Sequence, residues 1–327
     1  MNISQSEDLA EKSLWIGLSK IHGLGAQTFC ELLKVFGNPR NIYAASFQQL
    51  KAVVADNIAT EISRGVNEEA LAESMRWLSL ENNFLVTLAD SYYPKSLLEI
   101  PDPPPVLYAK GKLALLNQPS IAIVGSRNAT TQGEENAEAF AKGLCSFGLC
   151  IVSGLALGID GAAHRGALQA NGSTIAVAAT GLDLVYPSKH LDLAHQIAKH
   201  GLLISEFSLG ETSKPENFPR RNRLISGLSL GCLVVEASLQ SGSQITARLA
   251  AEQGREVFAI PGSIHSPTSK GCHQLIKQGA KLVDNLQDII EDLNLAHLNL
   301  TQRNSEEAPS DDSSSNQPWA VMGDEPI

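Results

Sequence analysis

Three arginines within four positions form the densest cluster of basic side chains in the sequence. Arg220, Arg221 and Arg223 follow Phe218, and Asn222 lies among them. Guanidinium groups bind phosphate oxygens through forked hydrogen bonds, and an aromatic ring offers a face on which a base can stack. The cluster therefore favours binding of a nucleic acid or nucleotide. The alternative is a solvated helix surface whose arginines pair with glutamates elsewhere in the chain.

Turns made of small residues follow three apolar stretches and are suited to binding anions. These turns are Gly125-Ser126-Arg127, Ser153-Gly154 and Ser241-Gly242-Ser243, the last of which precedes Thr246 in the first turn of a helix. Glycine lets backbone N–H groups approach a phosphate, and the start of a helix favours negative charge. Any one of them could be a plain strand-to-helix loop with a serine cap. Together with the arginines, they favour a phosphate-binding site.

Two further groups have weaker claims to chemistry. Lys189 follows Tyr186 in the stretch GLDLVYPSKH, where it could contact a phosphate or belong to an ordinary loop that opens a helix. Asp160 and His164 are four residues apart and share one helix face. A lone Asp–His pair more often orients a loop than catalyses a reaction.

Two motifs of well-known nucleotide-binding proteins are missing from the sequence. It contains no GxxxxGK[ST], and no GxGxxG follows the strand at 120–124. These absences argue against a P-loop nucleotidase and against dinucleotide binding, and the five scattered cysteines, which lack CxxC spacing, argue against a metal site.

The elements that would position these residues alternate from Pro119 onward. Short apolar stretches occur at 120–124, 149–153, 174–179, 202–205, 232–236, 256–260 and 281–283, with helical patterns between most of them. This alternation predicts an α/β, Rossmann-like fold: a mostly parallel sheet with helices on both faces. The turns would then face one crevice at the carboxyl ends of the strands. Earlier strands are expected at 84–88 and 106–109.

The first part of the chain reads as helical. Gly23-Leu24-Gly25 precedes the amphipathic segment 26–36, which matches a helix-hairpin-helix whose turn could bind a DNA phosphate. A tight turn within a small bundle explains the pattern equally well. We expect a small all-helical (helix-hairpin-helix or SAM-like) domain at 1–82 and the Rossmann-like domain at 83–296.

A disordered acidic tail is expected at 297–327. Six acids, one arginine and runs of serine lie in residues 301–327, and Trp319–Met322 forms an apolar island that a partner could bind.

The composition fits a cytoplasmic protein. The net charge of −10 argues against a generally basic surface, so any nucleic acid would have to bind at a local basic pocket. The sequence has neither eighteen consecutive apolar residues nor a signal peptide at its start, and its five cysteines are scattered. We therefore expect no membrane association and reduced cysteines.

Several long motifs resemble the DNA processing protein A family (DprA, also called Smf) over about residues 84–293. They are IAIVGSRNAT, SGLALGIDGAAHRGAL, FPRRNRLISGLS, VVEASLQSGSQITARLAAEQGREVFAIPG and GCHQLIKQGAKLV. The resemblance implies a cofactor-free, non-catalytic homodimer that binds single-stranded DNA with little sequence preference. It also implies that the protein protects incoming DNA during natural transformation, displaces the single-strand binding protein and loads the RecA recombinase.

The resemblance also assigns site residues. They are Gly125, Ser126 and Arg127 in a GSR turn, Lys189 in a tyrosine-proline loop, Arg221, Asn222 and Arg223 in an RNR motif, and Ser241, Gly242 and Thr246 in an SGSxxTA motif. Leu157 stands where many members have arginine. Many members continue into a winged-helix domain, whereas this sequence is expected to end in the acidic tail.

Two other functions remain open from the residues. The crevice could hold a nucleotide in an enzyme of the lysine-decarboxylase-like fold, which carries a PGGxGTxxE motif. This chain has Glu236 and an SGS sequence but no PGG. A purely architectural dimer that bridges proteins is the other alternative, although it would not need the arginine cluster.

Overall fold

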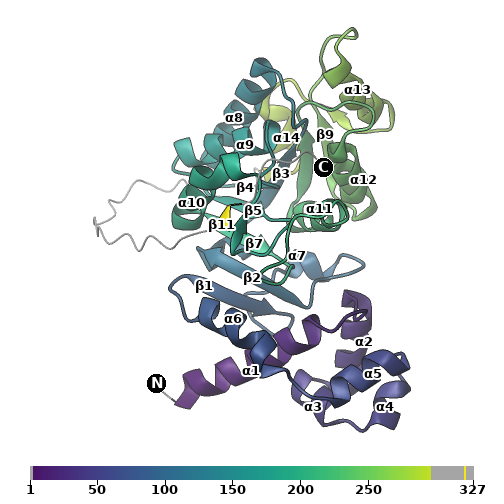
Figure 1. The fold of residues 1–327 in the computed structure, drawn as a ribbon. Helices are drawn as coiled ribbons and strands as arrows, with labels where there is room; N and C mark the ends of the chain where they lie inside the picture. Colours follow the sequence, from purple (N-terminus) through teal and green to yellow (C-terminus); the bar gives the residue numbers. More distant parts are fainter. Residues whose placement is uncertain (1–2, 296–319, 322–327) are drawn as a thin grey trace.

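A nine-stranded sheet runs through the computed structural model, which describes residues 3–295 and 320–321 (Figure 1). The strands, in spatial order, are β1 (Asn83–Thr87), β2 (Val106–Gly111), β7 (Leu202–Ser205), β5 (Thr174–Val177), β4 (Cys150–Ser153), β3 (Ser120–Val124), β8 (Gly231–Val234), β9 (Glu256–Ala259) and β10 (Lys281–Leu282). The pairs β1–β2 and β2–β7 are antiparallel, and the pairs from β7 through β5 to β10 are parallel. The predicted mostly parallel sheet is therefore confirmed.

Helices cover both faces of the sheet. One face carries α8 (Thr131–Ser146), α9 (Ile159–Gln169), α10 (Leu191–His200) and α14 (Leu286–Asp292), and the other carries α7 (Lys95–Leu98), α11 (Asn217–Leu228), α12 (Gly242–Glu252) and α13 (Lys270–Lys277). Side chains alternate along a strand, so Ile121 and Ile123 of β3 pack toward α8 and α9. Ala122 and Val124 pack toward α11 and α12. This double covering explains why the strand sequences are continuously apolar.

The order of the strands creates a crevice beside β3. The chain passes from β3 to β4 and β5 on one side, and it later returns to place β8 on the other side of β3. Ligands of open α/β sheets bind where the strand order reverses in this way, outside the carboxyl ends of the strands. The loops that follow β3 and β8 meet at this point.

The N-terminal helices form a small bundle against the antiparallel end of the sheet (Figure 1). They are α1 (Ile3–Ser19), α2 (Ala26–Phe36), α3 (Pro39–Ala44), α4 (Phe47–Lys51), α5 (Asp56–Ser63) and α6 (Glu68–Leu78). Trp77 of α6 packs edge-on against Tyr108 of β2, with 5.9 Å between ring centroids. Leu24 is buried between Gly23 and Gly25, and Gly23 adopts the positive φ of 85° that the turn requires. The predicted helical region is confirmed, while the domain boundaries stay predictions.

Short elements complete the described residues. They are the 3₁₀ helices at Leu113–Asn117, Ser188–His190 and Pro267–Ser269, and the parallel pair β6 (Leu184–Val185) and β11 (Ala320–Val321). Most of the tail predicted to be disordered lies outside the described residues. None of the described helices is both long and apolar enough to cross a membrane.

Candidate nucleic-acid interface

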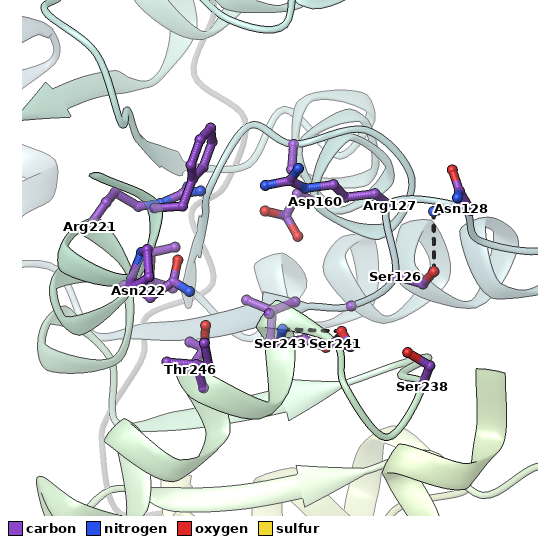
Figure 2. A pocket seen from close by; sticks show the side chains of 18 residues that line it. Ser126, Arg127, Asn128, Asp160, Arg221, Asn222, Ser238, Ser241, Ser243 and Thr246 are labelled. Carbon is purple, nitrogen blue, oxygen red and sulfur yellow. Dashed lines mark hydrogen bonds between the residues drawn. The ribbon is translucent and has the colours of Figure 1, made fainter. Parts of the chain in front are cut away.

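A cavity of about 340 Å³ lies at the carboxyl ends of β3 and β8 (Figure 2). Its lining comes from the β3–α8 loop, the start of α9, helix α11 and the start of α12. The lining residues are Val124, Gly125, Ser126, Arg127, Asn128, Ala156, Asp160, Phe218, Pro219, Arg221, Asn222, Ile225, Ser238, Ser241, Gly242, Ser243, Ile245 and Thr246. The structure thus brings two of the predicted anion turns and part of the arginine cluster to one place.

The β3–α8 loop needs glycine at its start. A Cβ on Gly125 would lie 2.5 Å from Cγ1 of Ile159, so a larger residue would push α9 away from the sheet. The next N–H, that of Ser126, donates to the carbonyl of Glu236 at 2.8 Å, and the Ser126 hydroxyl accepts from the Asn128 N–H at 3.1 Å. These bonds fold the loop so that Arg127 projects toward α11.

Arg127 lies over an aromatic ring. Its Cζ is 4.8 Å from the centroid of Phe218, and the Phe218 ring in turn contacts Tyr186 at 5.8 Å between centroids. A guanidinium on a ring face is attracted by the ring quadrupole. The result is an aromatic surface next to a permanent positive charge, which suits a nucleotide with its base and phosphate.

Arg221 forms the buried floor of the cavity. Only 3% of its surface is exposed, and Nη1 donates to the carbonyl of Val177 at 2.9 Å. A Cβ on Gly154 would lie 1.7 Å from that nitrogen, so glycine is required where the guanidinium passes. The Nε–H of Arg221 has no hydrogen-bond partner within the part of the chain that the structure describes.

The carboxylate of Asp160 faces the two arginines in the cavity (Figure 2). It accepts a hydrogen bond from the Gly154 N–H at 3.1 Å. Burial raises the pKa of Asp160, and the charge of Arg221 opposes that rise. Burial also lowers the pKa of Arg221 to about 10, which leaves it protonated at neutral pH. Asp160 therefore offsets part of the desolvation of Arg221 and secures the turn at Gly154.

The start of α12 supplies backbone donors. The Ser241 side chain caps the helix by accepting from the Ser243 N–H at 3.2 Å, and the space around Gly242 is open. Ser243 and Thr246 are almost fully buried beneath the cavity. An eleven-residue helix that begins at a cavity presents N–H groups and a partial positive charge to an anion there.

Five of the residues predicted from the sequence do not line the cavity: Ser153, Gly154, Lys189, Arg220 and Arg223. Ser153 donates through its hydroxyl to the carbonyl of Ile123 at 2.6 Å, inside the sheet. Gly154 supports Arg221 from below, as described above. Lys189 is exposed in the 3₁₀ helix Ser188–His190 that follows β6.

Arg220 and Arg223 turn to the opposite side of α11. Arg223 is buried and pairs with Glu206 at 2.5 Å and Asp102 at 3.0 Å. Arg220 lies 3.5 Å from Glu206, and its guanidinium stacks on Phe207 at 5.1 Å. The sequence left open whether the arginines bind a phosphate or pair with glutamates. The structure shows that Arg220 and Arg223 pair with Glu206.

Helical spacing is the signal that separates the two groups. Phe218, Arg221, Asn222 and Ile225 recur at intervals of three and four residues, so they share one face of α11. Arg220 and Arg223 share another face. Asn128, Ser238 and Ile245 also line the cavity and were not singled out from the sequence, although each lies within three residues of a predicted site residue.

Comparison with known proteins gives consistent results. The family model of DNA recombination-mediator protein A matches residues 84–294, which include every element that lines the cavity. Protein Smf of Escherichia coli (strain K12) is 41% identical over 286 residues, 87% of this chain and 76% of that protein. DNA processing protein DprA of Streptococcus pneumoniae is 50% identical over 204 residues, 62% of this chain and 72% of that protein.

Two solved structures share the fold. The X-ray structure of DNA processing protein A from Streptococcus pneumoniae is 39% identical with a TM-score of 0.77, over 86% of this chain and 97% of that one. The other concerns the unique single-stranded DNA binding mode of DNA processing protein A from Helicobacter pylori. It is 34% identical with a TM-score of 0.58, over 64% of this chain and 95% of that one. The chain therefore belongs to the DNA recombination-mediator protein A family, the family known as DprA or Smf.

Proposed function

We propose that this protein binds single-stranded DNA in the cavity at the ends of β3 and β8. The observation that carries the proposal is the combination of Arg127, Arg221 and the start of α12 around one aromatic ring, Phe218. The related protein from Helicobacter pylori, reported for its single-stranded DNA binding mode, supports the same ligand.

The chemistry of the cavity favours binding with little sequence preference. Arg127 and the N–H groups of α12 would contact phosphates, which are identical in every nucleotide. Phe218 would stack on a base, and every base has a face on which to stack. Backbone contacts combined with stacking therefore bind a strand without reading its sequence.

We further propose that the protein acts as a recombination mediator in natural transformation. In this role a cytoplasmic homodimer protects incoming single strands, displaces the single-strand binding protein and loads RecA recombinase. Membership of the recombination-mediator family supports the role. The test is RecA filament assembly on DNA coated with single-strand binding protein, which should be faster when this protein is added.

The DNA site is tested by Arg127→Ala. Losing one charge-assisted contact to a phosphate should weaken binding of a labelled oligo-dT about tenfold or more. The slope of log affinity against log salt should also become shallower by about 0.7. Fluorescence anisotropy at several salt concentrations measures both quantities.

Arg248→Ala is the matched control. Arg248 lies on α12, outside the cavity, with 68% of its side chain exposed and a loose pair to Glu252 at 3.7 Å. Arg248→Ala removes the same charge as Arg127→Ala, but it does so outside the cavity. Its affinity and salt slope should therefore stay near those of the wild type. If the two variants bound oligo-dT equally well, the cavity would not be the DNA site.

The alternative of a nucleotide-processing enzyme draws on Asp160, a carboxyl group in the cavity whose pKa is raised. That carboxylate already accepts from Gly154 and stabilises Arg221, which gives it a structural task. Release of free base from a panel of nucleotides would favour the enzyme.

A further inference from the structure

Glu236 contacts the loop that carries Arg127 at two separate points. Its backbone carbonyl accepts from the Ser126 N–H at 2.8 Å. Its carboxylate accepts from the Thr130 N–H at 3.0 Å and from the Thr130 hydroxyl at 2.6 Å. The two contacts bracket Arg127 and Asn128, the loop residues that project into the cavity. Glu236, which follows β8, therefore holds both ends of the 126–130 loop.

The carboxylate of Glu236 also completes the start of α8. Thr130 is the N-cap of this helix, and its hydroxyl oxygen accepts from the Gly133 N–H at 3.0 Å. A Cβ on Gly133 would lie 2.5 Å from Cδ of Glu236, so the helix leaves room for the carboxylate. A negative charge at this end of a helix is favoured by the helix dipole.

Glu236 is itself held firmly. It follows β8, an inner strand that pairs with β3 and β9. The next residue, Ala237, donates through its N–H to the Thr268 carbonyl at 2.7 Å and accepts from the Gly271 N–H at 2.8 Å. The loop is thus tied to a rigid part of the protein.

We propose that Glu236 is a positioning residue for DNA binding, which holds the 126–130 loop so that Arg127 lies over Phe218. This inference rests on the proposed function. Glu236 is not one of the described residues that line the cavity, so it would affect DNA binding through the position of the 126–130 loop.

The proposal predicts that removing the Glu236 carboxylate changes DNA affinity in the direction opposite to that expected from charge alone. Removing an acid close to a phosphate site should strengthen DNA binding if charge alone mattered. If Glu236 positions Arg127, Glu236→Ala should instead weaken oligo-dT binding about tenfold, because the guanidinium loses its fixed place. Glu236→Gln keeps one acceptor for Thr130, so its affinity for oligo-dT should lie between those of the wild type and Glu236→Ala.

The experiment combines two measurements on the intact chain. Hydrogen exchange of the free protein should show faster exchange at residues 126–130 in Glu236→Ala than in the wild type. Anisotropy should show weaker oligo-dT binding with a salt slope close to that of Arg127→Ala. The double variant Arg127→Ala/Glu236→Ala should bind no more weakly than Arg127→Ala, because both changes remove the same contact.

Glu252→Ala is the control for charge. This exposed acid on α12 is removed without touching the loop, and binding should stay unchanged or tighten slightly. Additive losses in the double variant, or wild-type affinity in Glu236→Ala, would overturn the positioning role while leaving the DNA site intact. Failure of the wild type to bind oligo-dT would overturn the proposed function and this inference with it.

A second pair of variants covers the possibility that Glu236→Ala does not fold. Thr130→Val removes the hydroxyl that donates to Glu236, and Thr130→Ser keeps it. The valine variant should lose affinity and the serine variant should retain it. Equal affinity of the two would also contradict the proposal.

Discussion

At the scale of single residues, His164 shows how burial constrains a titratable group. The imidazole is fully buried on α9, and Nδ1 lies 2.7 Å from the Thr174 hydroxyl. Burial lowers the pKa of His164 to about 3, and the nearby guanidinium groups of Arg221 and Arg165 act in the same direction. The Asp–His pair noted in the sequence is therefore divided between two tasks: Asp160 faces the cavity and His164 packs inside.

The stability of the protein should fall in mild acid because of His164. The folded state keeps the ring neutral, whereas the unfolded chain binds a proton below its pKa of about 6.5. The unfolded state thus binds more protons between pH 6.5 and 3, and the free energy of unfolding decreases as the pH falls through this range. Between pH 6.5 and 5.0 this one group should remove about 1.5 kcal/mol.

Urea unfolding of the wild type and His164→Gln at both pH values measures the effect. Glutamine retains a polar group near Thr174 and does not titrate. The wild type should lose more stability than the variant between the two pH values. Parallel losses would show that His164 accepts a proton without unfolding.

At the scale of elements, α11 divides its side chains between two tasks. Phe218, Arg221 and Asn222 line the cavity, while Arg223 is buried in a pair with Glu206 on the other side. Arg223→Ala should leave the Glu206 carboxylate buried without its closest partner. We expect a loss of about 3 kcal/mol in the free energy of unfolding, with oligo-dT affinity and salt slope unchanged.

Arg220→Ala is the comparison for that variant. The Arg220 side chain is 59% exposed, so its loss should change stability little. Urea unfolding and anisotropy on both variants separate the two tasks. A loss of affinity in Arg223→Ala at unchanged stability would extend the DNA site to the second face of α11.

The sequence predicts the elements better than it predicts the site. The strands of the parallel sheet carry mostly apolar runs, because both of their faces are buried, and the predicted ends of these runs agree with the observed strand ends to within two residues. Strand β6 was not predicted, since two residues are too few to show any periodicity. The crevice between β3 and β8 depends on the pairing of two strands that lie far apart in the sequence. The spacing of residues along the sequence does not predict which distant strands pair.

Side-chain direction limits the prediction of the site. The small-residue turns after β3 and β8 both reach the cavity, because loops after parallel strands share one edge. Ser153 and Gly154 are also small residues at the end of a strand, yet Ser153 belongs to β4 itself, and its hydroxyl donates to the Ile123 carbonyl of the neighbouring strand. Whether the Ser153 hydroxyl faces the cavity or the sheet depends on the residue at which β4 ends. The apolar pattern predicts the strand but does not fix that residue.

At the scale of the whole molecule, the helical bundle and the sheet share one core. Trp77 and Tyr108 join α6 to β2, and the same apolar cluster continues from the N-terminal helices into the sheet. Trp77→Ala should therefore cost about 3–5 kcal/mol in the free energy of unfolding, as for other large aromatic truncations. Because β7, β5 and β4 separate β2 from the strands at the cavity, β3 and β8, oligo-dT affinity should not change.

Far-UV circular dichroism during urea unfolding tests this prediction alongside anisotropy. A transition at lower urea with unchanged DNA affinity is the expected result. Weaker DNA binding in the folded variant would mean that the bundle and the cavity are energetically coupled.

The contact between Arg127 and Phe218 has a consequence for how a bound strand is released. A base that stacks on Phe218 in the proposed DNA site would compete with the Arg127 guanidinium, which lies over that ring in the free protein. In the proposed DNA site, this competition would make the ring release a stacked base more readily than an uncovered ring would.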